Sequence, residues 1–385
     1  MIDRARGRRS PPPDRLAVGG LARPRACVCN DAAAAARGTT GLVRRARHGW
    51  NFGTCLIGLV ACARPEPPAP APVAPPAAPA PAAPVPAAPV APEPPPEPAA
   101  EPEPPPPPPP TLPDGRPIVP CLDPPPPGLA CVLGGSFVRG SDVGPENTRP
   151  KALVWLQTYY MDIHEVTHAE YKACEKTGKC PVAGPRYNDY DRPRQPITGA
   201  SWYDAVAYCD AHGKHLPTEA EWEKAARGPD GAQFPWGDEP ATCERAIIKD
   251  ERGRSCGVKK RGSEADKGRT FEVGARPPGV YGLYDMSGNS WEWVADWASP
   301  SYAACGAACE GVDPKGPCGG ADRCPGHRQK VVRGGSWYWD ASYATAIYRR
   351  THFPKNQPYH HFGFRCAASP DEAAALAKAA APSDP

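Results

Sequence analysis

A proline-rich stretch limits how much of this 385-residue chain can fold into a compact domain. Of the 48 residues from Ala63 to Pro110, 25 are proline, and most of the others are alanine or glutamate. Proline lacks the backbone donor that helices and sheets require, and the stretch has too little apolar surface to offset the entropy lost on folding. We therefore expect a disordered linker over residues 63–120, whose proline-rich part reaches roughly 150 Å in extended form.

Charge and cysteine content narrow the classes of function. The formal net charge is only +3, and no basic run interleaved with aromatic residues occurs in the C-terminal two-thirds, so nucleic acid is not an expected partner. The sixteen cysteines are many for a cytosolic chain and indicate an oxidising compartment.

Residues 1–62 have the features of an N-terminal extension followed by a lipoprotein signal. A basic segment, 44–50, precedes an apolar run, 51–61, that is too short to span a bilayer, because spanning takes about 20 residues. The run ends in Leu59-Val60-Ala61-Cys62, which resembles the bacterial lipobox, where the cysteine becomes the lipidated first residue. We expect an exported cell-envelope lipoprotein, at the outer membrane or cell surface, held to the membrane through Cys62. An ordinary cleaved signal is the alternative.

Residues 121–368 are richer in aromatic residues, charge and glycine, and we expect them to form one loop-rich α+β domain followed by a disordered tail, 369–385. Capping boxes at Thr167, Ser201 and Thr218 predict helices over 168–176, 202–211 and 219–226. Short strands are expected over 136–139, 153–163, 331–333 and 363–367. The twelve cysteines from Cys121 to Cys366 form an even set, as disulfide pairing requires.

One motif invites a metal interpretation that its context disfavours. His164 and His168 fit the HExxH pattern of zinc proteases, which places both histidines on one helical face. Here the pattern crosses from a strand-like run into the helix cap at Thr167, so the two rings are not expected to share a face. His360 and His361 are a possible metal pair, but a polar loop is the favoured interpretation.

Eight segments in order resemble the sulfatase-modifying-factor family, whose best-known members are the formylglycine-generating enzymes. They are 134–137 (GGSF), 160–167 (YMDIHEVT), 197–209 (ITGASWYDAVAYC), 216–228 (LPTEAEWEKAARG), 234–237 (FPWG), 281–293 (YGLYDMSGNSWEW), 333–337 (RGGSW) and 363–366 (GFRC). The resemblance implies a C-type-lectin-like fold.

The resemblance also implies a metal site and a disulfide. Asp285, Gly288, Ser290 and Glu292 match a family calcium site, and two carboxylates with two backbone carbonyls suit a hard cation. A solvated turn is the alternative. Cys209 and Cys366 stand where the family has a structural disulfide. By their short spacing, Cys174–Cys180 and Cys243–Cys256 are plausible further pairs.

The family's catalytic pair is missing. Its enzymes oxidise a cysteine of a sulfatase peptide to formylglycine with O2 and copper(I) held by two thiolates. The matching positions are Trp339 and Ala344, neither of which can bind copper, so we expect no copper and no catalytic residue of the family type. The cysteines of 305–324 have a different spacing and are expected to form disulfides.

What remains is a changed groove whose expected lining is aromatic and polar: Ser336, Trp337, Tyr338, Trp339, Asp340 and Tyr343. Such a surface suits a peptide, protein or glycan ligand. Aromatic residues that merely fill the former active site are the equal alternative. The favoured function is therefore a non-catalytic binding module. A formylglycine-type oxidoreductase with a rearranged site and a structural envelope-assembly protein remain as alternatives.

Overall fold

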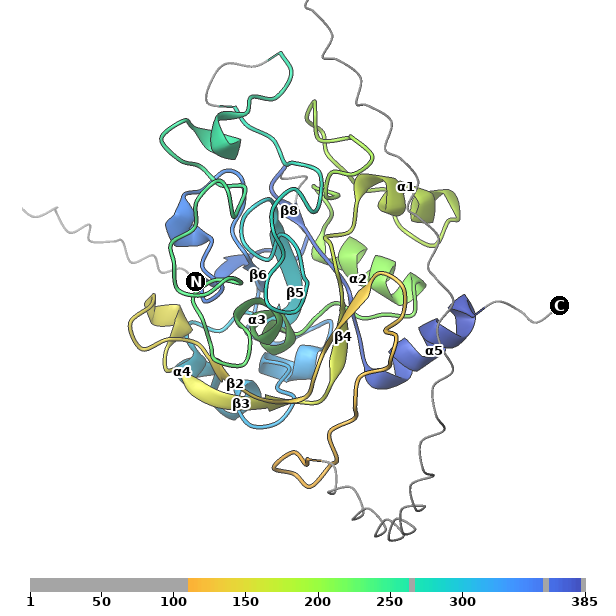
Figure 1. Ribbon diagram of the computed structural model, residues 1–385, viewed down its shortest axis with the longest axis vertical. Coiled ribbons are helices and arrows are strands. Elements are labelled where there is room, and N and C mark those ends of the chain that lie inside the picture. The colour runs from red at the N-terminus through yellow and green to blue at the C-terminus, as the bar shows by residue number, and fades with distance from the viewer. Residues whose placement is uncertain (1–109, 263–266, 356–359, 382–385) are drawn as a thin grey trace, which may run out of the picture. The chain divides into compact units, whose positions relative to one another are not determined.

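The computed structural model describes residues 110–262, 267–355 and 360–381 (Figure 1). The expected signal, Cys62 and nearly all of the proline-rich stretch lie outside the described residues. Contacts place every described residue in one unit, Pro98–Pro385. Within the described part of the chain, no helix is long and apolar enough to cross a membrane.

Three helices begin at the capping boxes that predicted them. They are α1 (His168–Lys176), α2 (Trp202–Ala211) and α3 (Glu219–Arg227), which ends one residue later than expected. In each helix, the hydroxyl of the N-cap residue accepts a hydrogen bond from the backbone amide of the third helical residue. The carboxylate of that third residue accepts in turn from the backbone amide of the N-cap residue. The two reciprocal bonds fix where each helix starts.

The strands form three small sheets. Strand β4 (Tyr159–Asp162) lies between β1 (Leu129–Val132) and β9 (Ala367–Ala368) in one sheet, and β2 (Gly135–Arg139) pairs with β3 (Ala152–Leu156) in the second. The third sheet has the order β7 (Arg350–His352), β6 (Lys330–Arg333), β5 (Trp291–Trp297) and β8 (Phe362–Gly363). All pairs are antiparallel except β5 with β8.

Several strand predictions were wrong in extent. The single strand expected over 153–163 is two strands, β3 and β4, which pair in different sheets. Strand β5 was not predicted, because nearly all of its residues are buried and it therefore shows no alternation of polar and apolar residues. The short helix α4 (Tyr302–Cys305) was also missed.

Two predicted domain boundaries are corrected. Residues 369–385 are not a wholly disordered tail, because Pro370–Ala380 forms helix α5, whose Ala373 is fully buried against the sheet of β4 and β9. Figure 1 shows α5 beside β4. The linker does not extend to residue 120 either, because Leu112 and Ile118 are buried in the domain.

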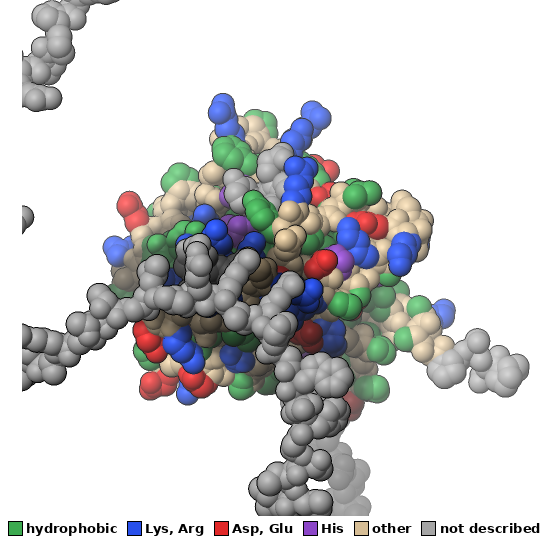
Figure 2. Space-filling view, turned by 90° about the horizontal axis from the view of Figure 1, so that it is seen from above, with side chains coloured by type: hydrophobic (Ala, Val, Ile, Leu, Met, Phe, Trp, Pro, Cys, Tyr) green, Lys and Arg blue, Asp and Glu red, His purple; other side chains and the backbone are tan. Residues whose placement is uncertain are grey.

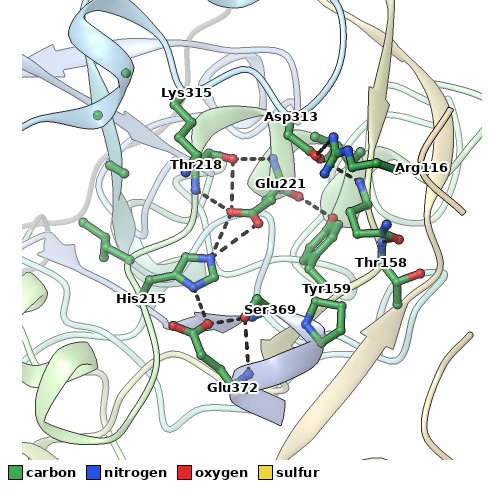
Figure 3. A pocket seen from close by; sticks show the side chains of 17 residues that line it. Arg116, Thr158, Tyr159, His215, Thr218, Glu221, Asp313, Lys315, Ser369 and Glu372 are labelled. Carbon is green, nitrogen blue, oxygen red and sulfur yellow. Dashed lines mark hydrogen bonds and ion pairs between the residues drawn. The ribbon is translucent and has the colours of Figure 1, made fainter. Parts of the chain in front are cut away.

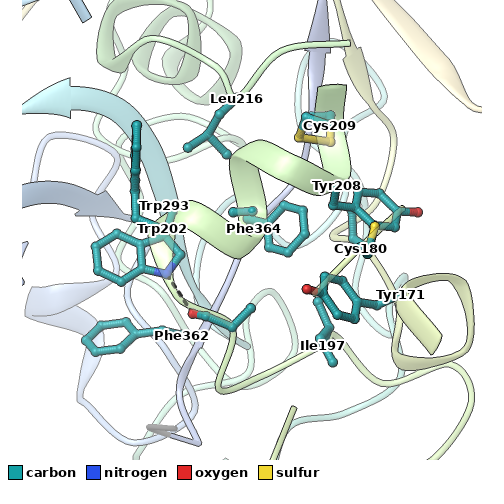
Figure 4. Packing of buried hydrophobic residues seen from close by; sticks show 14 of the residues in the cluster. Tyr171, Cys180, Ile197, Trp202, Tyr208, Cys209, Leu216, Trp293, Phe362 and Phe364 are labelled. Carbon is teal, nitrogen blue, oxygen red and sulfur yellow. Dashed lines mark hydrogen bonds between the residues drawn. A yellow bond between two sulfur atoms is a disulfide. The ribbon is translucent and has the colours of Figure 1, made fainter. Parts of the chain in front are cut away.

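The main core lies between α1, α2 and the four-stranded sheet (Figure 4). Tyr171, Tyr208 and Phe364 pack with their ring centroids 5.5–6.2 Å apart. The indole of Trp202 donates to the backbone of Val294, so the large ring is buried with its polar atom satisfied.

All twelve cysteines of the domain are paired in disulfides. The bridge from Cys209 to Cys366 joins α2 to the C-terminal strand region, where the family resemblance implied it. The other five close short loops: Cys121–Cys131, Cys174–Cys180, Cys243–Cys256, Cys305–Cys309 and Cys318–Cys324. Such bridges stabilise a domain in which much of the chain is loop.

Candidate functional site

The two positions that match the family's copper ligands follow strand β6 and contain no metal-binding atom. Trp339 is half-buried, and its indole ring lies 5.0 Å from that of Tyr343, between centroids. Ala344 is fully buried, and its carbonyl accepts from the Ser287 hydroxyl at 2.7 Å. Apolar packing therefore occupies the place where the family resemblance would put two thiolates.

No other thiol is present to replace them within the described residues, since each of those cysteines is in a disulfide. The pairs Cys305–Cys309 and Cys318–Cys324, in the segment before β6, form two bridges, as expected. A disulfide sulfur is not a thiolate, and Cu(I) binding of the family type requires thiolates.

The six expected groove residues do not line one surface. Trp337 and Tyr338 line a cavity of about 280 Å³. Trp339 and Tyr343 instead pack on the main core. The Asp340 carboxylate caps the turn that follows, accepting from the Ser342 amide and hydroxyl. Ser336 is buried.

Residues from three distant segments complete this cavity, and the sequence did not indicate them. We call it the Trp337 pocket; its lining is Tyr187, Tyr190, Arg254, Lys260, Lys267, Gly268, Trp337, Tyr338 and His360. The rings of Tyr187 and Trp337 lie 4.6 and 5.4 Å from that of His360. The Arg254 guanidinium stands 3.7 Å above the Tyr338 ring. The pocket is therefore aromatic and cationic.

The two histidines beside this pocket are uncharged at neutral pH. Burial, with Lys260 and Arg254 nearby, lowers the pKa of His360 to about 4. Burial and the neighbouring His360 lower the pKa of His361 to about 3. Their rings are 5.2 Å apart, and no group of three or more His, Cys, Asp or Glu side chains suited to a metal occurs among the described residues. The HExxH histidines are likewise separated, because His164 precedes α1 and His168 begins it.

The residues matched to calcium lie in the turn that enters β5 and on the strand itself. The Asp285 carboxylate accepts from the Gly274 amide at 2.7 Å. Glu292 forms a bidentate ion pair with Arg365, at 2.7 and 2.8 Å. Gly288 has φ +85°, and a Cβ there would come within 2.6 Å of the Ile247 carbonyl oxygen, so only glycine fits this turn.

A third carboxylate, which the sequence analysis did not assign, lies beside them. Glu165 is buried; one of its oxygens accepts from the Asn289 amide at 3.0 Å and the other has no partner. Burial, then the charges of Asp285 and Glu292, raise the pKa of Glu165 well above its usual value. Burial also raises the pKa of Asp285, to about 6. Burial is the first cause of both shifts, and three buried carboxylates, Glu165, Asp285 and Glu292, lie near Arg365.

This surplus of negative charge, with the unpaired Glu165 oxygen, fits a bound cation. Since the side chains alone do not form a metal cage, a cation here would also take backbone carbonyl oxygens, which Ca²⁺ accepts readily. The residues present therefore fit the calcium that the family resemblance implies.

A larger cavity, of about 550 Å³, lies between the segment around Arg116 and the start of α5 (Figure 3). His215 lies in it between two carboxylates: its Nδ1 is 2.8 Å from Glu372, and its Nε2 is 3.4 Å from Glu221. Arg116 pairs with Asp313 at 2.7 Å. Because these charged groups bind one another, they hold α5 and the segment around Arg116 in place rather than offering free groups to a ligand.

The face seen in Figure 2 has Lys and Arg side chains interspersed with Asp and Glu. A polyanion such as nucleic acid is bound by a continuous basic surface. The coloured part of this face shows none.

The described domain is thus a loop-rich α/β domain stapled by six disulfides. The model of the sulfatase-modifying factor enzyme 1-like domain matches residues 121–370, and the chain belongs to this family.

Individual relatives agree with this assignment. The chain is 38% identical to a formylglycine-generating enzyme of Thermomonospora curvata over 240 residues, which are 62% of this chain and 73% of that enzyme. It is 31% identical to the inactive C-alpha-formylglycine-generating enzyme 2 of Mus musculus, over 63% of this chain and 86% of the mouse protein. Among solved structures, PvdO from Pseudomonas aeruginosa aligns with a TM-score of 0.50 at 25% identity, covering 63% of this chain and 94% of PvdO.

Proposed function

We propose that this chain is a non-catalytic member of its family that binds a ligand in the Trp337 pocket. The observation that carries the proposal is the replacement of both thiolate positions, by Trp339 and Ala344, in a domain whose other described cysteines are all in disulfides. Without thiolates there is no two-coordinate Cu(I), and the family's oxidation has no metal. The mouse relative named as inactive shows that the family includes members without the activity.

An assay of peptide oxidation tests this proposal. The exported chain, supplied with copper and O2, is incubated with a Cys-x-Pro-x-Arg peptide, and the peptide mass is followed. We expect no conversion of cysteine to the aldehyde. The Thermomonospora enzyme is the positive control for the assay. Conversion by the native chain would establish the competing oxidoreductase with a rearranged site and reject the binding proposal.

A lipid anchor on the exported chain is the second part of the proposal. It is supported by the lipobox-like Leu59–Cys62 and by the proline-rich stretch that follows, which would hold the domain away from the membrane. Labelling with a fatty-acid analogue is expected to mark the native chain and not the Cys62→Ser variant. Equal labelling of both, or of neither, would reject the anchor.

Calcium is proposed as the bound ion, in the turn from Asp285 to Glu292. When bound, it would neutralise the buried carboxylates and hold that turn against β5.

An envelope-assembly role with no ligand in the pocket is the remaining candidate. It would be favoured if substitutions in the Trp337 pocket left every partner interaction of the chain intact.

A further inference from the structure

Three cations and no carboxylate line the Trp337 pocket among the residues that the structure describes. The ammonium groups of Lys260 and Lys267 have no hydrogen-bond or carboxylate partner there; that of Lys260 lies 5.8 Å from the Tyr187 ring centroid. A nearby carboxylate, Asp189, is buried and is already paired with Arg192 at 2.6 Å. The described lining of the pocket therefore carries positive charge, which suits an anionic group.

Uncharged groups that can form hydrogen bonds share the pocket with the three cations. His360 Nδ1 is buried and has no hydrogen-bond partner among the described residues, and a neutral imidazole has one nitrogen that donates a hydrogen bond and one that accepts. The hydroxyls of Tyr187 and Tyr338 are not engaged by other described residues, and each can donate or accept. In contrast, the Tyr190 hydroxyl is occupied, donating to Gly268 at 2.7 Å. The free groups therefore suit a ligand that carries hydroxyls as well as a charge.

The size of the pocket limits the ligand further. Pockets for drug-sized ligands begin at about 300 Å³, so a cavity of about 280 Å³ accepts one ring-sized group rather than a length of peptide. Aromatic rings form its walls, and Tyr187, which is 46% exposed, stands at its edge. Aromatic side chains pack well on the C–H-bearing face of a saturated ring such as a pyranose.

We propose that the Trp337 pocket binds an anionic sugar residue, with Lys260 and Lys267 on its carboxylate or sulfate and the aromatic rings against its pyranose ring. This inference rests on the proposed binding function and names its ligand class. Hydroxyls of the sugar would meet His360 Nδ1 and the Tyr187 and Tyr338 hydroxyls. A charge-assisted hydrogen bond contributes more than a neutral one, so the charged group dominates the affinity.

Ligand-observed NMR titration of the exported chain tests this with matched probes. Methyl glucuronide and methyl glucoside differ only in the carboxylate. Comparing methyl glucuronide with methyl glucoside 6-sulfate shows whether the pocket prefers a carboxylated or a sulfated sugar. We expect at least one anionic sugar to bind about tenfold more tightly than the glucoside. We expect this difference in affinity to shrink at high salt, because the ion pairs between the sugar and the two lysines would be partly exposed to solvent.

Variants show whether the binding is in this pocket. Lys260→Gln with Lys267→Gln is expected to abolish the tenfold preference, and Tyr187→Ala to weaken all three sugars. Lys315→Ala, an exposed lysine of the other cavity, is the matched control and should change nothing. Melting temperatures of all variants verify that they are folded.

Three outcomes would overturn the inference: equal binding of glucoside and anionic sugars, no binding of any of them, or tighter binding of tetraglutamate than of either anionic sugar. Each of these leaves the absence of catalysis standing, since that part of the proposed function is rejected by oxidation of the Cys-x-Pro-x-Arg peptide by the native chain and not by the choice of sugar.

Discussion

Trp339, which the family resemblance aligns with a metal-ligand position, has a ring that packs against its neighbours. Its centroid is 5.0 Å from those of Tyr338 and Tyr343, and the Arg350 guanidinium lies 5.0 Å from it. Truncating a fully buried tryptophan typically destabilises a domain by about 3–5 kcal/mol, and the half-buried Trp339 is expected to cost less than that. Restoring the two thiols would therefore leave a void, and any such variant needs its stability measured before its chemistry is interpreted.

His215 gives a prediction about pH. Burial alone would lower its pKa, but Glu221 and Glu372 outweigh burial and raise the pKa to about 10. This pKa lies above the pKa of about 6.5 that histidine has in the unfolded chain. The charged His215 therefore stabilises the fold fully below pH 6.5, and the stabilisation is lost as the pH rises toward 10. We expect the melting temperature to fall over this range, and His215→Gln to remove most of that fall.

The control for His215 is Glu310→Gln, an exposed glutamate, which should retain the native pH dependence. If the native chain and His215→Gln lose melting temperature in parallel between pH 6.5 and 10, the ion pairs with Glu221 and Glu372 do not stabilise the fold.

At the scale of elements, α5 depends on its first turn. The Ser369 hydroxyl accepts from the Glu372 amide, and the Glu372 carboxylate accepts from the Ser369 amide at 2.7 Å. Losing a serine N-cap typically costs about 0.5–2 kcal/mol. We expect Ser369→Ala to speed amide hydrogen exchange across α5, while Lys378→Ala, at the other end, should change it little. Unchanged exchange in Ser369→Ala would show that packing alone holds the helix.

The turn that enters β5 gives a prediction about metal removal. If calcium neutralises Glu165 and Asp285, chelation returns surplus charge to a buried site and the domain loses stability. We expect EDTA to lower the melting temperature, added calcium to restore it, and elemental analysis to find calcium in the untreated chain. A melt unaffected by EDTA, in a chain that contains no calcium, would reject the site.

Features that depend on neighbouring residues could be predicted from the sequence, whereas contacts between segments far apart in the chain could not. The capping boxes at Thr167, Ser201 and Thr218 each lie within four residues and fixed three helix starts. The same capping box is present at Ser369, where α5 begins, so the prediction of a disordered tail over 369–385 was wrong. The Trp337 pocket could not be predicted, because Tyr187, Lys260 and His360 meet only through the tertiary fold.

At the scale of the whole molecule, the described domain is a family scaffold held by disulfides. The Cys209–Cys366 bridge spans 157 residues and joins α2 to the C-terminal strands, whereas the other bridges fix local loops. Long-range bridges restrict the unfolded chain most. Cysteine in the described part of this chain therefore serves stability, while the family's oxidising enzymes also use it for metal chemistry.

The most direct test is a Cu(I) competition titration of the full chain with Cys27, Cys29, Cys55 and Cys62 replaced by serine and the six disulfides intact. We predict that the chain takes no stoichiometric Cu(I) from a strong chelator. We also predict that Trp339→Cys with Ala344→Cys, if the variant remains folded, gains a Cu(I) site. One equivalent of Cu(I) held tightly by the native disulfide-bonded domain would show that it keeps a copper site.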